Sequence, residues 1–278
     1  MAALGVHYRR SPCMAIGRDV YVDSRMILQR LEELYPDSTV YPALSSKATA
    51  GLAALLNKFT IDASVFSRGV AIMPPDFPAV SDEQFVKDRA GFYGTQWTIR
   101  DALKQRPESL AHVRQCFDIA ESLFVDGRDW VAGTSGPSLA DLEGVWSFDW
   151  IISDLQPPAK YFSRAIYPRV YGWRDRFRAA VRSAQASAPR PVSLQGSDAI
   201  PRLLQSPFAD VDLLVDADDP LELVRGALVD LFPTDGGGFT HRDRGRLVKL
   251  TKDEVAIEVR CPTGVSVHIH APRWQFRI

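Results

Sequence analysis

The stretch SPCMAIGRDVYVDSRMILQRLEEL, from Ser11 to Leu34, decides the fold prediction because its periodicity changes from strand to helix. Two runs of β-forming residues, 13–16 and 20–22, flank the turn-forming residues 17–19, which is typical of a β-hairpin. Ser24 is then the expected N-cap of a helix. The residues that carry the helical spacing are Ile27, Leu28, Leu31 and Leu34.

The section that follows is helical throughout. Apolar residues recur at helical spacing from Ser45 to about Ser187, and Pro or Gly residues separate the segments. We therefore expect an all-helical domain over 45–187 with short connections. The candidate helices are 47–73, 82–105, 108–125, 139–155 and 161–186, with Pro107 among the breakers.

The last section favours strands. Residues 186–201, rich in Ala, Ser, Pro and Gln, are typical of a linker, and period-two strand patterns follow them. The candidate strands are 223–232, 246–250, 254–260 and 265–270, with glycine turns near 236–238 and 264. We predict an α+β multidomain chain with a strand-strand-helix domain at 1–42, the bundle at 45–187 and a small barrel-like β domain at 200–278.

Composition excludes several classes of protein. The 278 residues carry 33 Lys and Arg against 34 Asp and Glu, so neither nucleic acid nor an anionic membrane is expected as the main partner. No apolar run approaches the roughly 20 residues that span a bilayer. The three cysteines form no CxxC pattern, which favours a reducing compartment and predicts a cytoplasmic protein.

Three short motifs together resemble the cytosolic glutathione transferase family. Ser11-Pro12 stands where that family has a Pro, usually cis, before the third strand of a thioredoxin-like domain, and Asp23-Ser24 matches the pair that opens the next helix. Ser138 to Asp141 matches a Ser/Thr-x-x-Asp box of the helical domain. The resemblance covers about residues 4–182. It looks closest to fungal members with an extra C-terminal module ending in a phrase similar to APRWQFRI, and it implies a homodimer.

The resemblance implies a glutathione-binding role for four residues. The backbone of Ser11, turned by a cis Pro12, would pair with the cysteinyl amide of glutathione. Ser24 and the positive helix end would receive the γ-glutamyl carboxylate, and Asp23 would meet the ligand's ammonium. A purely structural interpretation stays open, in which Pro12 belongs to an edge strand and Ser24 only caps its helix.

The resemblance assigns no catalytic residue. The reaction needs a glutathione thiolate, which the family stabilises with a Tyr, Ser or Cys near the first strand of the thioredoxin-like domain. No residue before Ser11 matches that position, so an N-terminally truncated domain is expected, with strand 13–16 open along one edge. The alternatives are Tyr8, Cys13 or a residue from another chain, and no motif spacing supports any of them.

Ser138 and Asp141 are expected to act in folding. In a capping box, the Ser side chain binds the N–H three residues later and the acid returns to the Ser N–H. Replacing either residue should destabilise the buried helix by about 1 kcal/mol or more.

A His-x-His pair stands near the C-terminus. On a strand, His268 and His270 would share one face, with Cys261 and His241 as conceivable further ligands. No CxxC or HExxH motif accompanies them, so we expect no metal.

Three functions remain open, and the first two are implied by the resemblance. The first is a glutathione transferase-like protein that binds glutathione and conjugates or isomerises a hydrophobic small molecule, with Phe59 and Phe66 as candidate contacts for that molecule. The alternative is a non-catalytic glutathione transferase-like binding or assembly protein. The third possibility is that the β module holds a small ligand or a metal of its own.

Overall fold

The computed structural model describes residues 1–36, 44–62, 65–74, 77–93, 98–235, 238 and 240–278. The chain divides into two units. The sheet unit comprises residues 1–34, 91–95 and 191–278, and the helical unit comprises 35–90 and 96–190. The domain boundary expected at residue 42 lies outside the described residues, as do the predicted glycine-turn positions 236 and 237.

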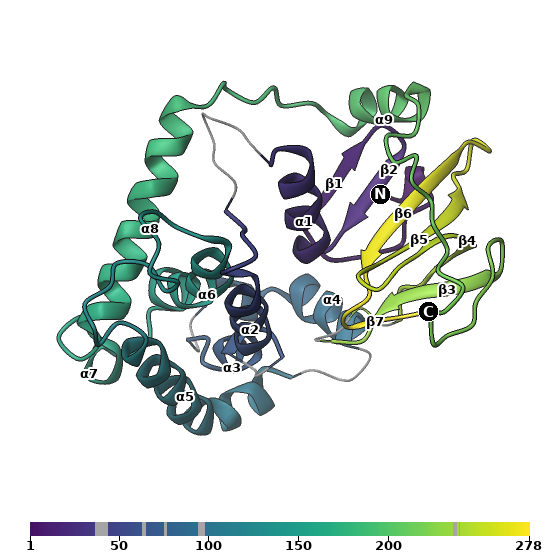
Figure 1. The fold of residues 1–278 in the computed structure, drawn as a ribbon. Helices are drawn as coiled ribbons and strands as arrows, with labels where there is room; N and C mark the ends of the chain where they lie inside the picture. Colours follow the sequence, from purple (N-terminus) through teal and green to yellow (C-terminus); the bar gives the residue numbers. More distant parts are fainter. Residues whose placement is uncertain (37–43, 63–64, 75–76, 94–97, 236–237, 239) are drawn as a thin grey trace. The chain divides into compact units, whose positions relative to one another are not determined.

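The sheet unit is built around one seven-stranded sheet with the order β1-β2-β6-β5-β4-β3-β7 (Figure 1). The 3-10 helix η1 precedes the hairpin, α1 follows it, and α9 precedes the later strands. The bounds are η1 Ala2–Leu4, β1 Cys13–Ile16, β2 Asp19–Val22, α1 Ser24–Leu34, α9 Gly196–Gln205, β3 Leu228–Pro233, β4 Asp243–Leu250, β5 Glu254–Arg260, β6 Ser266–Pro272 and β7 Phe276–Arg277.

The expected separation of the first and last sections is replaced by a shared sheet. Strand β2 pairs in parallel with β6, with Val20 opposite Ile269, while β1 pairs with β2 and β5 with β6 in antiparallel fashion. The described strands therefore form an open mixed sheet with β1 and β7 at its edges, and not the barrel-like module that the turn pattern predicted. Turn spacing specifies hairpins but contains no signal for the β2–β6 pairing.

The two faces of this sheet differ in chemistry because side chains alternate along each strand. One face is apolar, and η1 and α9 contribute residues to its core. Its buried members include Val20, Val22, Val255, Ile257, Val267, Ile269, Leu4 and Tyr8. The other face contacts α1 through Tyr21, Met26 and Ile27, and it contains buried acids and both histidines of the His-x-His pair.

The helical unit forms a bundle with its own core. Its elements are α2 Ala50–Thr60, α3 Val65–Ala71, η2 Pro78–Ser81, α4 Glu83–Tyr93, α5 Ile99–Ser122, α6 Leu139–Trp150, the π-helical η3 Ile151–Leu155, α7 Ala159–Phe162 and α8 Pro168–Ser187. The last residues of α4, 91–93, belong to the sheet unit. Trp173 is fully buried and packs against Phe124 and Phe148.

Several helix boundaries differ from the sequence prediction. The candidate helices 47–73 and 161–186 are each divided, into α2 and α3 and into α7 and α8. Pro107 lies inside α5 and does not separate two helices, so the candidate break there is wrong. A proline removes one backbone N–H, and a long helix packed in a bundle tolerates this loss as a local irregularity. Residues 196–205, expected as the end of a linker and the start of a strand section, form the amphipathic helix α9.

Ser138 and Asp141 form the capping box at the start of α6. The backbone N–H and the hydroxyl of Ser138 both donate to Asp141 Oδ2, at 2.9 and 2.7 Å. Asp141 Oδ1 accepts the Val131 N–H and the Trp173 indole N–H, both at 2.8 Å. One buried carboxylate therefore fixes a loop, a helix start and the central tryptophan of the bundle.

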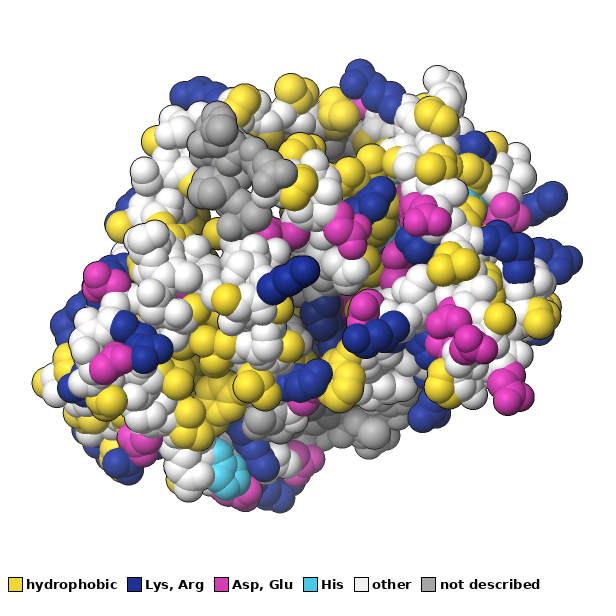
Figure 2. All heavy atoms as spheres, in the orientation of Figure 1, with side chains coloured by type: hydrophobic (Ala, Val, Ile, Leu, Met, Phe, Trp, Pro, Cys, Tyr) yellow, Lys and Arg dark blue, Asp and Glu magenta, His cyan; other side chains and the backbone are white. Residues whose placement is uncertain are grey.

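The surface carries both signs of charge. Lys and Arg side chains alternate with Asp and Glu over the face shown in Figure 2. This mixture fits the near-neutral composition and shows no basic stripe on that face. Within the described residues, no helix has the length and apolar character needed to cross a bilayer.

Candidate functional site

The predicted glutathione-binding residues lie together at one end of the β1–β2 hairpin. The antiparallel register pairs Cys13 with Val22, so the residues just before β1 and those just after β2 lie at the same end of the hairpin. Ser11 and Pro12 are exposed, and the peptide bond between them is cis. Ser24 is half-buried and is the first residue of α1. This end of the hairpin therefore contains both an exposed segment and the N-terminus of α1.

Asp23, and not Ser24, caps helix α1. Its carbonyl accepts the Ile27 N–H at 3.1 Å, and its Oδ1 accepts the Arg25 N–H at 3.0 Å. The residue has a positive φ of 73°, a conformation that Asp adopts more readily than most residues. The sequence predicted Ser24 as the N-cap, but the N-cap is the preceding residue, Asp23. The Ser24 side chain therefore lies at the helix end without the capping role.

Arg25 neutralises Asp23. Its Nε donates to Asp23 Oδ1 at 2.7 Å and its Nη2 to Oδ2 at 2.8 Å. Burial raises the pKa of Asp23, but the hydrogen bonds and charge of Arg25 outweigh burial and hold that pKa below its ordinary value. Arg25 Nη2 also lies 3.4 Å from Asp235, and the buried Nη1 has no hydrogen-bond partner among the described residues.

Tyr8 and Cys13 lie in the interior of the sheet unit. Tyr8 is buried and stacks on Phe276 at 6.1 Å, and burial raises the pKa of its phenol strongly. Cys13 is half-buried, its thiol donates to the Arg10 carbonyl at 3.4 Å, and burial raises its pKa as well. Both side chains therefore stay protonated at neutral pH, as expected of core residues.

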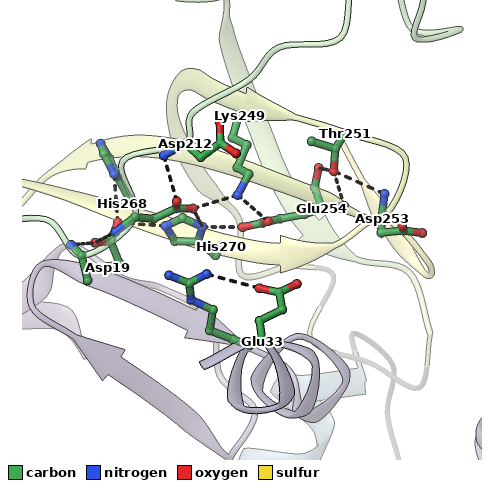
Figure 3. A network of polar contacts seen from close by, with 12 residues as sticks. Asp19, Glu33, Asp212, Lys249, Thr251, Asp253, Glu254, His268 and His270 are labelled. Carbon is green, nitrogen blue, oxygen red and sulfur yellow. Dashed lines mark hydrogen bonds and ion pairs between the residues drawn. The ribbon is translucent and has the colours of Figure 1, made fainter. Parts of the chain in front are cut away.

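A second polar site lies on the α1 face of the sheet (Figure 3). Asp19 on β2 lies opposite His268 on β6, and His270 is two residues further along the same strand. Asp19 Oδ1 lies 3.0 Å from His268 Nδ1 and 2.9 Å from His270 Nε2. All three side chains are buried. We call this set, together with Asp210, Lys249 and Glu254, the buried polar cluster.

His270 is an imidazolium in this cluster. Its Nδ1 lies 2.6 Å from Glu254 Oε1, while its Nε2 faces Asp19. Since both nitrogens face carboxylate oxygens, both carry protons. Burial lowers the pKa of His270, but hydrogen bonds to Asp19 and Glu254 outweigh it and raise that pKa above its ordinary value.

Lys249 completes the charge balance on the other side of the cluster. Its Nζ lies 2.8 Å from Asp210 Oδ2 and 2.8 Å from Glu254 Oε2. Burial raises the pKa of each of these two carboxyls, and their cationic partners lower it further than burial raises it. All three groups are therefore ionised at neutral pH.

Neighbouring groups hold the cluster in place. Tyr21 stacks on His270 with 4.5 Å between ring centroids, and Phe208 stacks on His268 at 3.8 Å. Asp19 Oδ2 accepts the backbone N–H groups of residues 209 and 210. Each ring is therefore covered on one side, and each oxygen of Asp19 has a fixed direction.

The sequence pattern correctly predicted that the two histidines share one face of a strand. It did not predict which residues contact them. His241 lies near Arg9 at 3.4 Å, and the Cys261 thiol contacts the Thr263 hydroxyl at 2.9 Å, so neither joins His268 and His270. Asp19 was interpreted only as a turn residue. The one available signal was an acid at the start of a predicted strand, which is too common to single it out.

The architecture belongs to the glutathione transferase-like fold. The structure matches a GST-like protein from Pseudomonas syringae with a TM-score of 0.67 and 23% sequence identity, covering 99% of this chain and 84% of that chain. It also matches the beta-etherase LigF from Sphingobium sp. strain SYK-6, with a TM-score of 0.49 and 19% identity over 64% of this chain and 79% of that chain.

The sequence comparisons add a family without an assigned role. Residues 68–186, in the helical part of the chain, match the family described as Domain of unknown function (DUF7962). A search of the curated proteins found no match. Fold similarity therefore extends over nearly the whole chain, while the sequence match is confined to its middle.

Proposed function

We propose that this chain is a glutathione transferase-like protein that binds glutathione at the end of the β1–β2 hairpin. The observation that carries the proposal is the antiparallel pairing of β1 with β2, which puts the exposed residues 11–12, just before β1, at the same end of the hairpin as the start of α1, just after β2. An exposed backbone segment and a helix N-terminus suit a peptide that carries carboxylates. The glutathione transferase-like fold supports the same assignment.

Four residues divide the work in this proposal. The backbone of Ser11, before Pro12, pairs with the cysteinyl amide of glutathione, and Ser24 with the α1 N-terminus binds the γ-glutamyl carboxylate. Asp23 binds the ammonium group. A carboxylate offers about four acceptor positions. Among the described residues, Arg25 makes two hydrogen bonds to Asp23 Oδ1 and one to Oδ2, so the proposed ammonium contact is at Oδ2.

We further propose a hydrophobic small molecule as the second ligand. Phe66 is 39% exposed and packs on Trp146 and Trp150 at 5.6 and 5.3 Å, so it presents an aromatic surface. Phe59 instead packs on Phe148 within the bundle.

A cytoplasmic homodimer is part of the same proposal, and sedimentation equilibrium measures its mass.

Thermal unfolding in the presence of glutathione tests the proposal. A ligand that binds only the folded chain raises Tm by mass action. We expect millimolar glutathione to raise Tm of the wild type, and Ser24→Ala to reduce that rise. Ser183→Ala, an exposed serine on α8, is the matched control and should leave the rise unchanged. No rise in the wild type contradicts the proposal.

A non-catalytic role is the second candidate. It is favoured by the packing of Tyr8 and Cys13, the two alternatives considered for activating a thiol, in the core of the sheet unit. Incubation with glutathione and an aromatic electrophile, with thioether formation followed by mass spectrometry, separates the two candidates. Binding without product above the uncatalysed rate supports the non-catalytic protein, and product that depends on Ser24 supports the transferase.

A further inference from the structure

We propose that Asp19, His268 and His270 form a binding site for a divalent transition metal ion of the Zn²⁺ class. This inference is independent of glutathione binding and concerns the other end of the β1–β2 hairpin, where β2 begins beside β6. The proposed ligand atoms are Asp19 Oδ1, His268 Nδ1 and His270 Nε2.

The three ligand atoms converge. Both ring nitrogens lie within 3.0 Å of the same carboxylate oxygen, and all three atoms lie within 4.8 Å of one another. Ligand atoms around a zinc ion at bonds of about 2.0–2.1 Å stand slightly more than 3 Å apart, so small outward shifts admit the ion. The groups come from two adjacent strands of one sheet, which is a rigid support.

The surroundings match those of metal ligands. A metal-binding histidine usually donates its other ring N–H to a carboxylate, as His270 Nδ1 does to Glu254 at 2.6 Å. The second carboxylate oxygen of Asp19, Oδ2, accepts two backbone N–H groups, from residues 209 and 210. These bonds orient Asp19 and His270 without using the atoms that would hold the ion.

The charges of the cluster also favour a divalent cation. Asp19, Asp210 and Glu254 are carboxylates, and Lys249 is the cation that bridges the last two. Apart from the two imidazoles, three carboxylates therefore face one ammonium group in a buried environment. Buried charges are costly unless they are paired, and a divalent cation held by Asp19 would add positive charge to this set.

The donor set selects the class of metal. Two imidazoles and one carboxylate suit Zn²⁺ and its transition-metal neighbours, whereas Mg²⁺ prefers oxygen ligands alone. Three protein ligands leave a fourth position for water. The nearby group of Asp210, Glu254 and His270 is a poorer candidate, because Lys249 already occupies the space between its two carboxylates.

Calorimetric titration of the full chain, first dialysed against a chelator, tests the site. We expect one equivalent of Zn²⁺ to bind with a Kd below about 1 μM. Co²⁺ should bind with the visible absorption of a low-symmetry four-coordinate site, and Mg²⁺ should not compete. His268→Ala should weaken Zn²⁺ binding at least about 100-fold. Glu254→Gln, which removes the carboxylate that orients His270 and pairs with Lys249, should weaken it about 10- to 100-fold.

Two controls keep the result decisive. His112→Ala removes a histidine on α5 outside the cluster and should leave the affinity unchanged. Asp19→Asn retains shape and a metal-binding oxygen, so it replaces His268→Ala if the latter fails to fold, and it should still weaken binding. The proposal is overturned if the folded wild type binds no stoichiometric Zn²⁺, or if His112→Ala weakens binding as much as the cluster variants do.

Discussion

His270 Nε2 lies 2.9 Å from Asp19 Oδ1, although 251 residues separate the two in the chain. This contact joins the first hairpin to the last long strand of the sheet unit, beside the parallel pairing of β2 with β6. The N-terminal hairpin is therefore fastened to the C-terminal strands both by backbone hydrogen bonds and by a buried charge pair.

Removing this pair should loosen the junction of β2 and β6. Asp19→Ala leaves the His270 imidazolium without one of its two carboxylates, and breaking a buried ion pair costs about 3–5 kcal/mol. Hydrogen exchange of the β2 and β6 amides in metal-free protein measures the effect locally. Asp129→Ala, which removes an exposed acid on the helical unit, is the control. Equal exchange protection of the β2 and β6 amides in both variants would rule out a stabilising role for the Asp19–His270 pair.

Asp141 should contribute more to the stability of the helical unit than Ser138, its partner in the capping box. Asp141→Ala leaves the Val131 N–H and the Trp173 indole without their acceptor, and each unsatisfied buried group costs about 1–3 kcal/mol. Ser138→Ala should cost about 1 kcal/mol. Urea unfolding followed by tryptophan fluorescence measures both, with Thr98→Ala at the exposed N-cap of α5 for comparison. A smaller loss for Asp141→Ala than for Ser138→Ala would contradict this order.

Two helical glycines should respond oppositely to alanine. A Cβ at Gly144 on α6 would stand 2.7 Å from the ring of Trp173, so Gly144→Ala should destabilise the bundle by about 1–3 kcal/mol. A Cβ at Gly51 on α2 meets nothing within 4 Å, so Gly51→Ala should stabilise the helix by up to about 1 kcal/mol. Chemical denaturation measures the change in the free energy of unfolding for each variant. A change of the same sign for both would contradict the tight packing of Trp173 against Gly144.

Acid should release the start of α1. The pKa of Asp23 lies below its ordinary value of 3.8 in the folded chain, because Arg25 outweighs the effect of burial. Its contribution to stability is therefore complete above about pH 4 and is lost as pH falls through the lower folded pKa. Exchange protection of the Ile27 amide, which bonds the Asp23 carbonyl, should fall over that window. Asp23→Asn should lack this acid-dependent loss; an identical profile would refute the assignment.

Local patterns predicted most elements of the fold. Helical spacing located the helices on either side of Ser138, and the Ser-x-x-Asp pattern predicted a capping box that the structure contains, because both features depend on neighbouring residues. Pro107 misled the prediction, since the same residue can start a helix or lie within one.

Local sequence patterns could not predict the buried polar cluster. The alternation of residues put His268 and His270 on one face, but their partner Asp19 depends on the parallel pairing of β2 with β6. That pairing joins the two ends of the chain, and no turn or spacing specifies it. Asp23 was recognised, but not its capping role, because its positive φ is a property of the folded turn.

Amide mapping of glutathione binding tests the central claim most directly. In ¹H–¹⁵N spectra of the full chain, saturating glutathione should shift the amides of Ser11, Ser24 and Arg25, and Ser24→Ala should weaken the fitted affinity while Ser183→Ala does not. Shifts confined to residues outside the hairpin end and the α1 N-terminus, or no shifts at millimolar glutathione, would contradict the proposed function.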